Sequence, residues 1–298
     1  MSAIYSSQAG ARAVRERYLA FLDRWPVPAE RLMLPTREGD TFVMASGPKD
    51  GPALLLFHGS GANATMWMRD VAEWSKHFRV LAVDMIGEPG LSAPSRPPLA
   101  SDAYALWLDD VMRGLGLERA SIVGVSLGGW LALDYATRRP ERVERLVLLC
   151  PGGVGRQKKG WMLFLPLMFL GSWGRRKMRE RILGRAPQDA SPAMQQMGEF
   201  ISLIFASFRP RRDKLPIFSD AALRHLAMKL LVVLGGRDVL LDTRETRRRF
   251  ARNVKTADIR FIPDAGHLIR DQTLPILEFV SKAASSCRGR PPCTGSGI

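Results

Sequence analysis

Eight short apolar runs, rich in valine, leucine and isoleucine, constrain the fold of this chain more than any other feature. We expect strands at 31–36, 41–47, 53–59, 79–84, 120–125, 142–150, 229–236 and 257–264. The later runs are almost continuously apolar, which is typical of strands buried on both faces of a parallel sheet. Helical patterns lie between them, near 64–76, 102–116, 127–138, 242–252 and 273–285. The alternation predicts an α/β fold, with a mostly parallel eight-stranded sheet flanked by helices and opened by an antiparallel hairpin.

The alternation stops in the middle of the chain, between residues 151 and 218. A flexible basic segment is followed there by two densely apolar stretches, with a short basic helix between them and no strand pattern. We expect this part to form a helical insertion laid over the sheet. The predicted organisation is an α/β core of residues 1–155 and 216–285, a helical cap at 156–215 and a disordered tail at 286–298.

An amphipathic helix is expected near the N-terminus. Val14, Tyr18, Leu22 and Trp25 recur at helical spacing, and Pro26 ends the pattern. This segment lacks the basic-then-apolar order and the cleavage site of a signal peptide. No apolar run reaches the roughly 20 residues that span a bilayer.

Composition and cysteine usage favour a cytoplasmic globular protein. Of the 298 residues, 46% are hydrophobic and 24% are charged, which is ordinary for a globular chain. Cys150, Cys287 and Cys293 do not have the spacing of metal ligands. We therefore expect a reducing compartment and no zinc site.

A strong basic excess needs an interpretation. The chain carries a formal net charge of +15, and residues 156–215 hold 13 basic side chains against four acidic ones. Nucleic-acid binding is one reading of such charge, but no nucleic-acid-binding motif accompanies it. Contact with anionic membranes is a second reading that stays open without being favoured. The favoured interpretation is that these basic side chains form a solvated surface.

One serine stands among glycines where a predicted strand turns directly into a predicted helix. Residues 124–128 read GVSLG, the G-x-S-x-G pattern, with Ser126 at the turning position. Such a turn strains the backbone of its central residue and exposes the side chain, while Gly124 and Gly128 keep strand and helix from clashing. The context predicts that Ser126 is a nucleophile rather than an incidental turn residue.

A serine hydroxyl needs a base to remove its proton, and the chain has four histidines. We expect His77 and His225 at the surface. His58 follows the third strand in a Gly-rich segment and should brace its loop. His267 follows the last strand, at the C-terminal edge of the sheet, where open α/β sheets bind ligands. His267 is therefore the predicted base.

The base needs an acid that fixes its tautomer and stabilises its protonated form. Asp238 lies just after the preceding strand, and the chain order Ser126, Asp238, His267 is the one expected for this arrangement. Asp242 is expected to cap the following helix, and Asp264 to serve a turn. Asp238 is therefore the predicted acid.

Backbone amides should complete the site. The segment HGSGAN at 58–63 follows the third strand with small residues, which lets its N–H groups approach a substrate closely. The N–H of Ser60 and that of Leu127, at the start of the helix after Ser126, are the predicted oxyanion donors.

Together these motifs resemble the α/β-hydrolase superfamily. HGSG, VDMIGEPGLS, GVSLGG, PERVERLVLL, GGRD and DAGHL fall in that family's order over about residues 30–155 and 219–282. The likeness is greatest to bacterial cofactor-free carboxylesterases, and it implies Ser126 as nucleophile, Asp238 as acid and His267 as base. Glu88-Pro89 departs from the Gly-x-Gly-x-Ser of many members. The cap, which largely sets substrate choice, matches no motif.

These observations predict a serine hydrolase that cleaves a small carboxylic ester with an apolar acyl part. The same triad could serve carbon–carbon bond hydrolysis, thioester cleavage or perhydrolysis, and a non-catalytic ligand-binding member of the fold is a further alternative. Epoxide and haloalkane hydrolysis need a carboxylate where Ser126 stands. The sequence does not define the acyl chain length, the alcohol or the oligomeric state.

Overall fold

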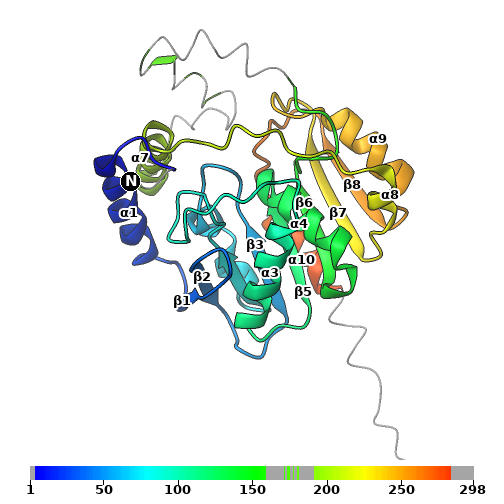
Figure 1. Cartoon of the computed structure of the whole chain (residues 1–298), viewed down its shortest axis with the longest axis horizontal. Coiled ribbons are helices and arrows are strands. Elements are labelled where there is room, and N and C mark those ends of the chain that lie inside the picture. Colours follow the sequence, from blue (N-terminus) through cyan, green and yellow to red (C-terminus); the bar gives the residue numbers. More distant parts are fainter. Residues whose placement is uncertain are drawn as a thin grey trace, which may run out of the picture.

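One mixed β-sheet organises the computed structural model (Figure 1), which describes residues 4–158 and 191–282, together with 171, 173, 174, 177 and 180. Its eight strands lie in the order β1-β2-β4-β3-β5-β6-β7-β8. They are β1 (Ala29–Leu34), β2 (Thr41–Ser46), β3 (Ala53–Phe57), β4 (Arg79–Val83), β5 (Ala120–Val125), β6 (Val143–Leu149), β7 (Lys229–Gly235) and β8 (Ala257–Ile262). β2 is antiparallel to both β1 and β4, and every other pairing is parallel. The predicted fold class, the strands and the opening hairpin are confirmed.

Helices cover both faces of the sheet. They are α1 (Gln8–Leu22), η1 (Ala64–Trp67), α2 (Val71–Trp74), α3 (Ala103–Gly114), α4 (Leu127–Arg138), η2 (Pro140–Arg142), α7 (Pro192–Ser207), α8 (Asp220–Arg224), α9 (Thr243–Asn253) and α10 (Thr273–Ser281). The predicted helices at 102–116, 127–138 and 242–252 are confirmed within two residues at each end. Among the described residues, no helix is long and apolar enough to cross a lipid bilayer.

Two hydrophobic cores result, one on each face. Leu55 and Phe57 of β3 pack with residues of α3, α4, α8 and α9. Their neighbours Leu54 and Leu56 point the other way and pack with residues of α1, α2, α7 and α10. Successive strand side chains alternate between faces, so an apolar run without polar gaps supplies both cores. This double burial makes the central strands a rigid base for the loops at their C-terminal ends.

The prediction of one continuous helix at 64–76 is wrong. The chain forms η1, breaks at residues 68–70 and resumes as α2. Asp70 precedes α2 but does not cap it; its carboxylate instead accepts the hydroxyl hydrogen of Thr273 at the start of α10. The Asp70 side chain therefore links the start of α2 to the start of α10 instead of capping α2.

The N-terminal helix packs against α7 rather than against the sheet alone. Tyr18 stacks on Phe200 with ring centroids 6.3 Å apart, Phe21 approaches the same ring at 5.1 Å, and Arg17 pairs with Glu199 at 3.1 Å. In Figure 1 the two helices lie side by side. The predicted apolar stripe is confirmed for Val14, Tyr18 and Leu22, which are buried. The prediction is wrong for Trp25: α1 ends at Leu22, before Pro26, and Trp25 lies beyond it, where its Nε1 donates to the Ser46 hydroxyl at 3.0 Å.

The middle of the predicted cap, residues 159–190, lies outside the described residues except for 171, 173, 174, 177 and 180, and so does the predicted tail at 286–298. α7 belongs to the C-terminal part of the predicted cap, and α1 packs against α7. The division into a core of 1–155 and 216–285 and a cap of 156–215 stays a prediction.

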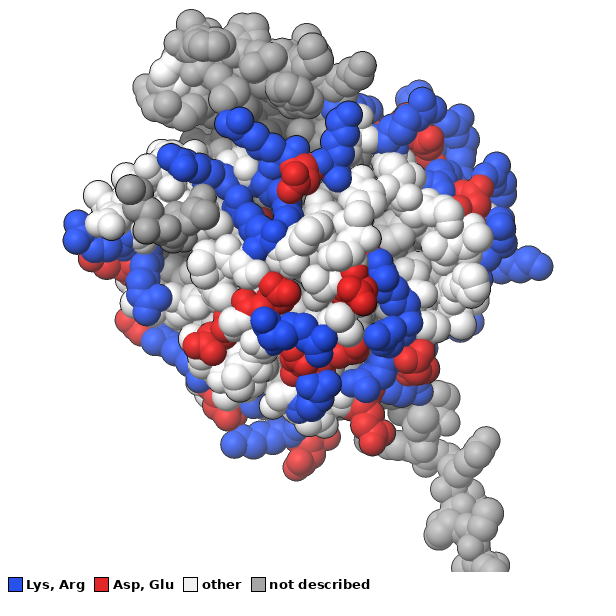
Figure 2. Space-filling model, viewed as in Figure 1, with Lys and Arg blue, Asp and Glu red and all other residues white. Residues whose placement is uncertain are grey.

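Basic side chains gather on the face shown in Figure 2, over α9 and over the segment after α7. α9 alone contains five arginines. Several of them are engaged in packing: Arg249 bonds to Asp220 of α8 at 2.7 Å, and Arg247 lies over the ring of Phe261 at 5.4 Å. Part of the positive charge therefore joins helices and strands to one another.

The helix after Ser126 approaches β3 so closely that only glycine fits at its second position. A Cβ added to Gly128 would lie 2.3 Å from the carbonyl oxygen of Phe57 and 2.5 Å from that of His58. A Cβ on Gly124 would lie 2.5 Å from the carbonyl oxygen of Gly128. These contacts are with backbone, which cannot move aside as a side chain can.

We expect Gly128→Ala to lower the free energy of unfolding by about 1–3 kcal/mol, because the added methyl group forces α4 away from β3. Gly198→Ala is the matched control, since Gly198 is also helical and a Cβ there meets nothing within 4 Å. This control should gain about 0.5–1 kcal/mol from the higher helix propensity of alanine. Denaturant unfolding of both variants measures the difference, and equal stability would contradict the close approach.

Candidate active site

Ser126 occupies a strained turn between β5 and α4. Its backbone has φ 53° and ψ −108°, in the left-handed half of conformational space that side chains other than glycine avoid. Its N–H donates to the carbonyl of Leu149 at 3.0 Å, and its carbonyl accepts from Trp130 and Gly152. The residue is thus held by strand and helix together, as the G-x-S-x-G pattern predicts.

The three predicted triad residues lie within hydrogen-bond reach of one another. The Ser126 hydroxyl donates to Nε2 of His267 at 2.9 Å. Nδ1 of His267 donates to Oδ2 of Asp238 at 2.7 Å. Because an ionised carboxylate only accepts hydrogen bonds, Asp238 fixes the proton on Nδ1 and leaves Nε2 free to act as a base. The geometry is that of a nucleophile, a base and an orienting acid, drawn from three different loops.

The surroundings of Asp238 favour its charged form. Oδ1 accepts the N–H groups of Leu240 and Leu241 at 2.7 and 3.0 Å. Burial acts to raise the pKa of Asp238, but the hydrogen bond and charge of His267, with these two amides, outweigh it and hold the pKa below its ordinary value. Lys158 binds the same residue from outside, donating to its backbone carbonyl at 2.6 Å. Asp238 is therefore placed and ionised for its predicted role.

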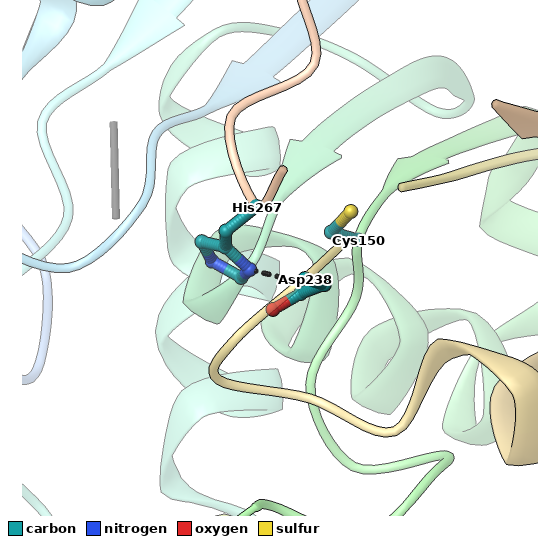
Figure 3. Close-up of side chains that lie close together, drawn as sticks. All are labelled: Cys150, Asp238 and His267. Carbon is teal, nitrogen blue, oxygen red and sulfur yellow. Dashed lines mark hydrogen bonds and ion pairs between the residues drawn. The ribbon is translucent and has the colours of Figure 1, made fainter. Parts of the chain in front are cut away.

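Cys150, at the end of β6, lies beside the acid and was not among the predicted site residues (Figure 3). Its Sγ lies within 4.8 Å of a carboxylate oxygen of Asp238 and of a ring nitrogen of His267. Burial, followed by the charge of Asp238, raises the pKa of the Cys150 thiol well above its usual range. A thiol that resists ionisation is a poor metal ligand, and the other two groups already bind each other. The position of Cys150 just past a strand was the signal that could have placed it here.

His58 braces the loop at residues 58–61, as predicted. It is fully buried, its Nδ1 donates to the carbonyl of Gly59 at 2.8 Å, and its Nε2 accepts the N–H of Met85 at 3.0 Å. Burial lowers the pKa of His58 to about 4, so the ring stays neutral. The two bonds tie the start of the loop to the end of β4.

The segments that carry the predicted oxyanion donors lie next to Ser126. A Cβ added to Gly59, just before Ser60, would lie 3.7 Å from Cβ of Ser126. Leu127 is the first residue of α4, so its N–H has no partner within the helix. Within the described part of the chain, no acceptor binds the N–H of Ser60 or Leu127. Their use as donors to a substrate oxyanion stays a prediction.

The competing candidates serve structural roles. Asp242 caps α9, accepting the N–H of Glu245 at 2.9 Å. Asp264 is exposed and pairs with Arg237 at 2.6 Å. His77 and His225 are both exposed, as expected. None of these four groups shares a hydrogen bond with Ser126 or His267.

A model of the alpha/beta hydrolase family matches residues 54–278 of the chain. Carboxylesterase YbfK of Bacillus subtilis (strain 168) is 31% identical over 264 residues, which is 85% of this chain and 87% of YbfK. The crystal structure of that protein, carboxylesterase CesB, is similar with a TM-score of 0.76 at 29% identity, covering 95% of this chain and 100% of the other. Naproxen esterase of B. subtilis is similar with a TM-score of 0.79 at 29% identity, covering 93% and 99%. The likeness extends over nearly the whole length of each chain.

We expect Cys150 to be inert toward iodoacetamide in the folded protein, because alkylation requires an exposed thiolate. After unfolding in guanidinium chloride the same residue should react completely. Mass spectrometry of the peptide that contains Cys150 distinguishes the two states. Rapid alkylation of the folded protein would contradict the burial and the raised pKa.

Proposed function

The chain belongs to the alpha/beta hydrolase family, and on that premise we propose that it is a serine hydrolase that cleaves small carboxylic esters. Ser126 is the proposed nucleophile, His267 the base and Asp238 the acid. The observation that carries the proposal is the continuous hydrogen-bond relay from Oγ of Ser126 through His267 to Asp238. Similarity to carboxylesterases over most of the chain supports ester hydrolysis as the reaction.

The reaction would proceed in two steps. In the first, Oγ of Ser126 attacks the ester carbonyl while Nε2 of His267 takes the hydroxyl proton. His267 then gives this proton to the leaving alcohol, which departs and leaves an acyl group on Ser126. In the second step, His267 takes a proton from water, and the resulting hydroxide attacks the acyl carbonyl. The free acid leaves, and the proton returns to Ser126.

The negative charge that develops on the carbonyl oxygen needs donors that are already in place. The proposed pair is the N–H of Ser60 and the N–H of Leu127, the latter at the positive end of α4. Losing one such donor typically costs about 3 kcal/mol of transition-state stabilisation. The side chain of Ser60 has no part in this, since only its backbone would act.

The proposed substrate is a broad chemical class rather than a particular compound. We propose a small-molecule ester with an apolar acyl part, while carbon–carbon bond hydrolysis, thioester cleavage and perhydrolysis would use the same triad. Contact with anionic membranes is not favoured. The low cysteine content favours a cytoplasmic location.

Ser126→Ala should reduce hydrolysis of short-chain p-nitrophenyl esters by at least about a thousandfold, because the nucleophile is lost. Ser75→Ala is the matched control and should stay within about threefold of wild type, because Ser75 follows α2, away from the triad. A fluorophosphonate probe should label wild type and Ser75→Ala at Ser126, and should not label Ser126→Ala. Unchanged hydrolysis in Ser126→Ala would refute the mechanism, and a folded wild type that resists the probe would favour a ligand-binding protein without turnover.

Asp238→Asn should reduce kcat by about a hundredfold or more with little change in KM, because an amide leaves the imidazole tautomer unfixed. Steady-state kinetics on the same esters measure the split. Asp242→Asn is the control, since it conserves the helix cap and touches neither Ser126 nor His267. Equal loss in both variants would argue against a specific role of Asp238.

A further inference from the structure

A buried carboxylate outside the triad holds the loop that carries the proposed oxyanion donor. Glu88 lies in the turn after β4 and is 3% exposed. We propose that Glu88 is a positioning residue that fixes residues 58–61 in the conformation needed to bind the oxyanion. This role rests on the proposed function, because it acts through the backbone N–H of Ser60.

Glu88 binds the loop directly. Its Oε2 accepts a short hydrogen bond from the N–H of Gly61 at 2.6 Å and a longer one from the hydroxyl of Ser60 at 3.3 Å. Gly61 has φ 71°, a left-handed conformation that glycine adopts without strain. The peptide that follows Ser60 is therefore held by its N–H, next to the peptide N–H that is proposed to face the substrate.

The loop is fixed at both ends by the segment after β4. His58 accepts the N–H of Met85 at one end, and Glu88 accepts the N–H of Gly61 at the other. Just beyond, the N–H of Ala64 donates to Asp84 at 2.9 Å. With both ends held by buried groups, Ser60 has little freedom to rotate its peptide. A donor that is already oriented stabilises the transition state without reorganisation.

Two arginines stabilise the turn that carries Glu88. Arg96 donates twice to the carbonyl of Gly87, at 3.0 and 2.9 Å, and Arg211 donates to the carbonyl of Arg96 at 2.9 Å and to the hydroxyl of Tyr104 at 2.9 Å. Burial raises the pKa of Glu88 to about 7, against the lowering effects of the Gly61 amide, Arg96, the Ser60 hydroxyl and Arg211. The two arginines and the loop groups therefore offset only part of the effect of burial, and the geometry of the turn, rather than charge, fixes Glu88 as an acceptor.

The same network reaches the segment after α7. Arg96 also donates to the carbonyl of Arg209 at 2.8 Å and lies over the ring of Phe208 at 5.2 Å. A Cβ added to Gly61 would lie 3.9 Å from that ring. The loop is therefore enclosed between Glu88 on one side and Phe208 on the other.

The test compares Glu88→Ala and Glu88→Gln with wild type on a short-chain p-nitrophenyl ester. The alanine variant loses the acceptor, and we expect kcat to fall at least about tenfold while KM changes less than about threefold, since the defect concerns the transition state. The glutamine variant keeps a carbonyl oxygen for the N–H of Gly61, and it should recover most of the lost kcat. Asp110→Asn controls for the loss of a buried carboxylate elsewhere, because Asp110 binds Arg37 and Arg113 and does not contact the loop.

A transition-state analogue separates positioning from general stability. A trifluoromethyl ketone that adds to Ser126 forms an oxyanion, so its inhibition constant in Glu88→Ala should rise in parallel with the loss of kcat/KM. Hydrogen exchange should be faster at Gly61 in Glu88→Ala than in wild type. Asp110→Asn should change neither the inhibition constant nor this exchange.

The outcomes are distinct. A folded Glu88→Ala with wild-type kcat and ketone affinity would overturn the positioning role, as would a loss that Glu88→Gln does not relieve. Undiminished turnover in Ser126→Ala would instead refute the proposed function.

Discussion

The backbone of Ser126 is the constraint on which the rest of the site depends. A left-handed serine between β5 and α4 is tolerated only because the surrounding structure determines it on every side. β5 is hydrogen-bonded to β3 and β6, and α4 sits against β3 at a distance that excludes any side chain at Gly128. The strain is the means by which the hydroxyl projects beyond the sheet, and the doubly buried strands supply the stability that offsets it.

Around this turn the structure uses buried polar groups as fixed points, and each has partners. Asp84 accepts from the Tyr18 hydroxyl at 2.8 Å and from the N–H of Leu91 at 2.8 Å, and burial raises its pKa to about 6. The hydroxyl of Ser92 donates to the carbonyl of Asp84 and accepts the N–H of Phe42. Isolated polar groups at these positions would be costly, whereas paired ones give the segment from Asp84 to Ser92 a single conformation. That segment carries both groups that hold the loop at 58–61, Met85 and Glu88.

The sheet could be predicted from the sequence because its strands are buried on both faces. Leu54–Phe57 and Leu230–Leu234 are therefore unbroken apolar runs. The sequence was also sufficient to bring Ser126, Asp238 and His267 together because each follows a parallel strand, and such strand ends meet at one edge of a sheet.

Glu88 could not be found in this way. Its importance comes from burial and from its contact with the loop at 58–61, which the local pattern does not encode. Cys150 does follow a parallel strand, but its burial beside Asp238 is evident only in the structure. Likewise the apolar stripe of α1 predicts that something covers it, but Phe200 of α7 was not identifiable from periodicity.

The joining of α1 to the end of α7 has a consequence for the order in which the molecule assembles. The hydroxyl of Ser6 binds the carbonyl of Ser207, 201 residues away in sequence, and the N–H of Arg209 binds the carbonyl of Ile4. Contacts of such long sequence separation require the closure of large loops, so they form late compared with neighbouring parallel strands and their helices. The hydrophobic core on this face of the sheet contains residues of both α1 and α7, among them Tyr18, Phe200 and Phe208, so it is complete only once these contacts have formed. Phe208 also lies beside Gly61, so completing this core and covering the loop that carries the proposed oxyanion donor belong to the same stage of assembly.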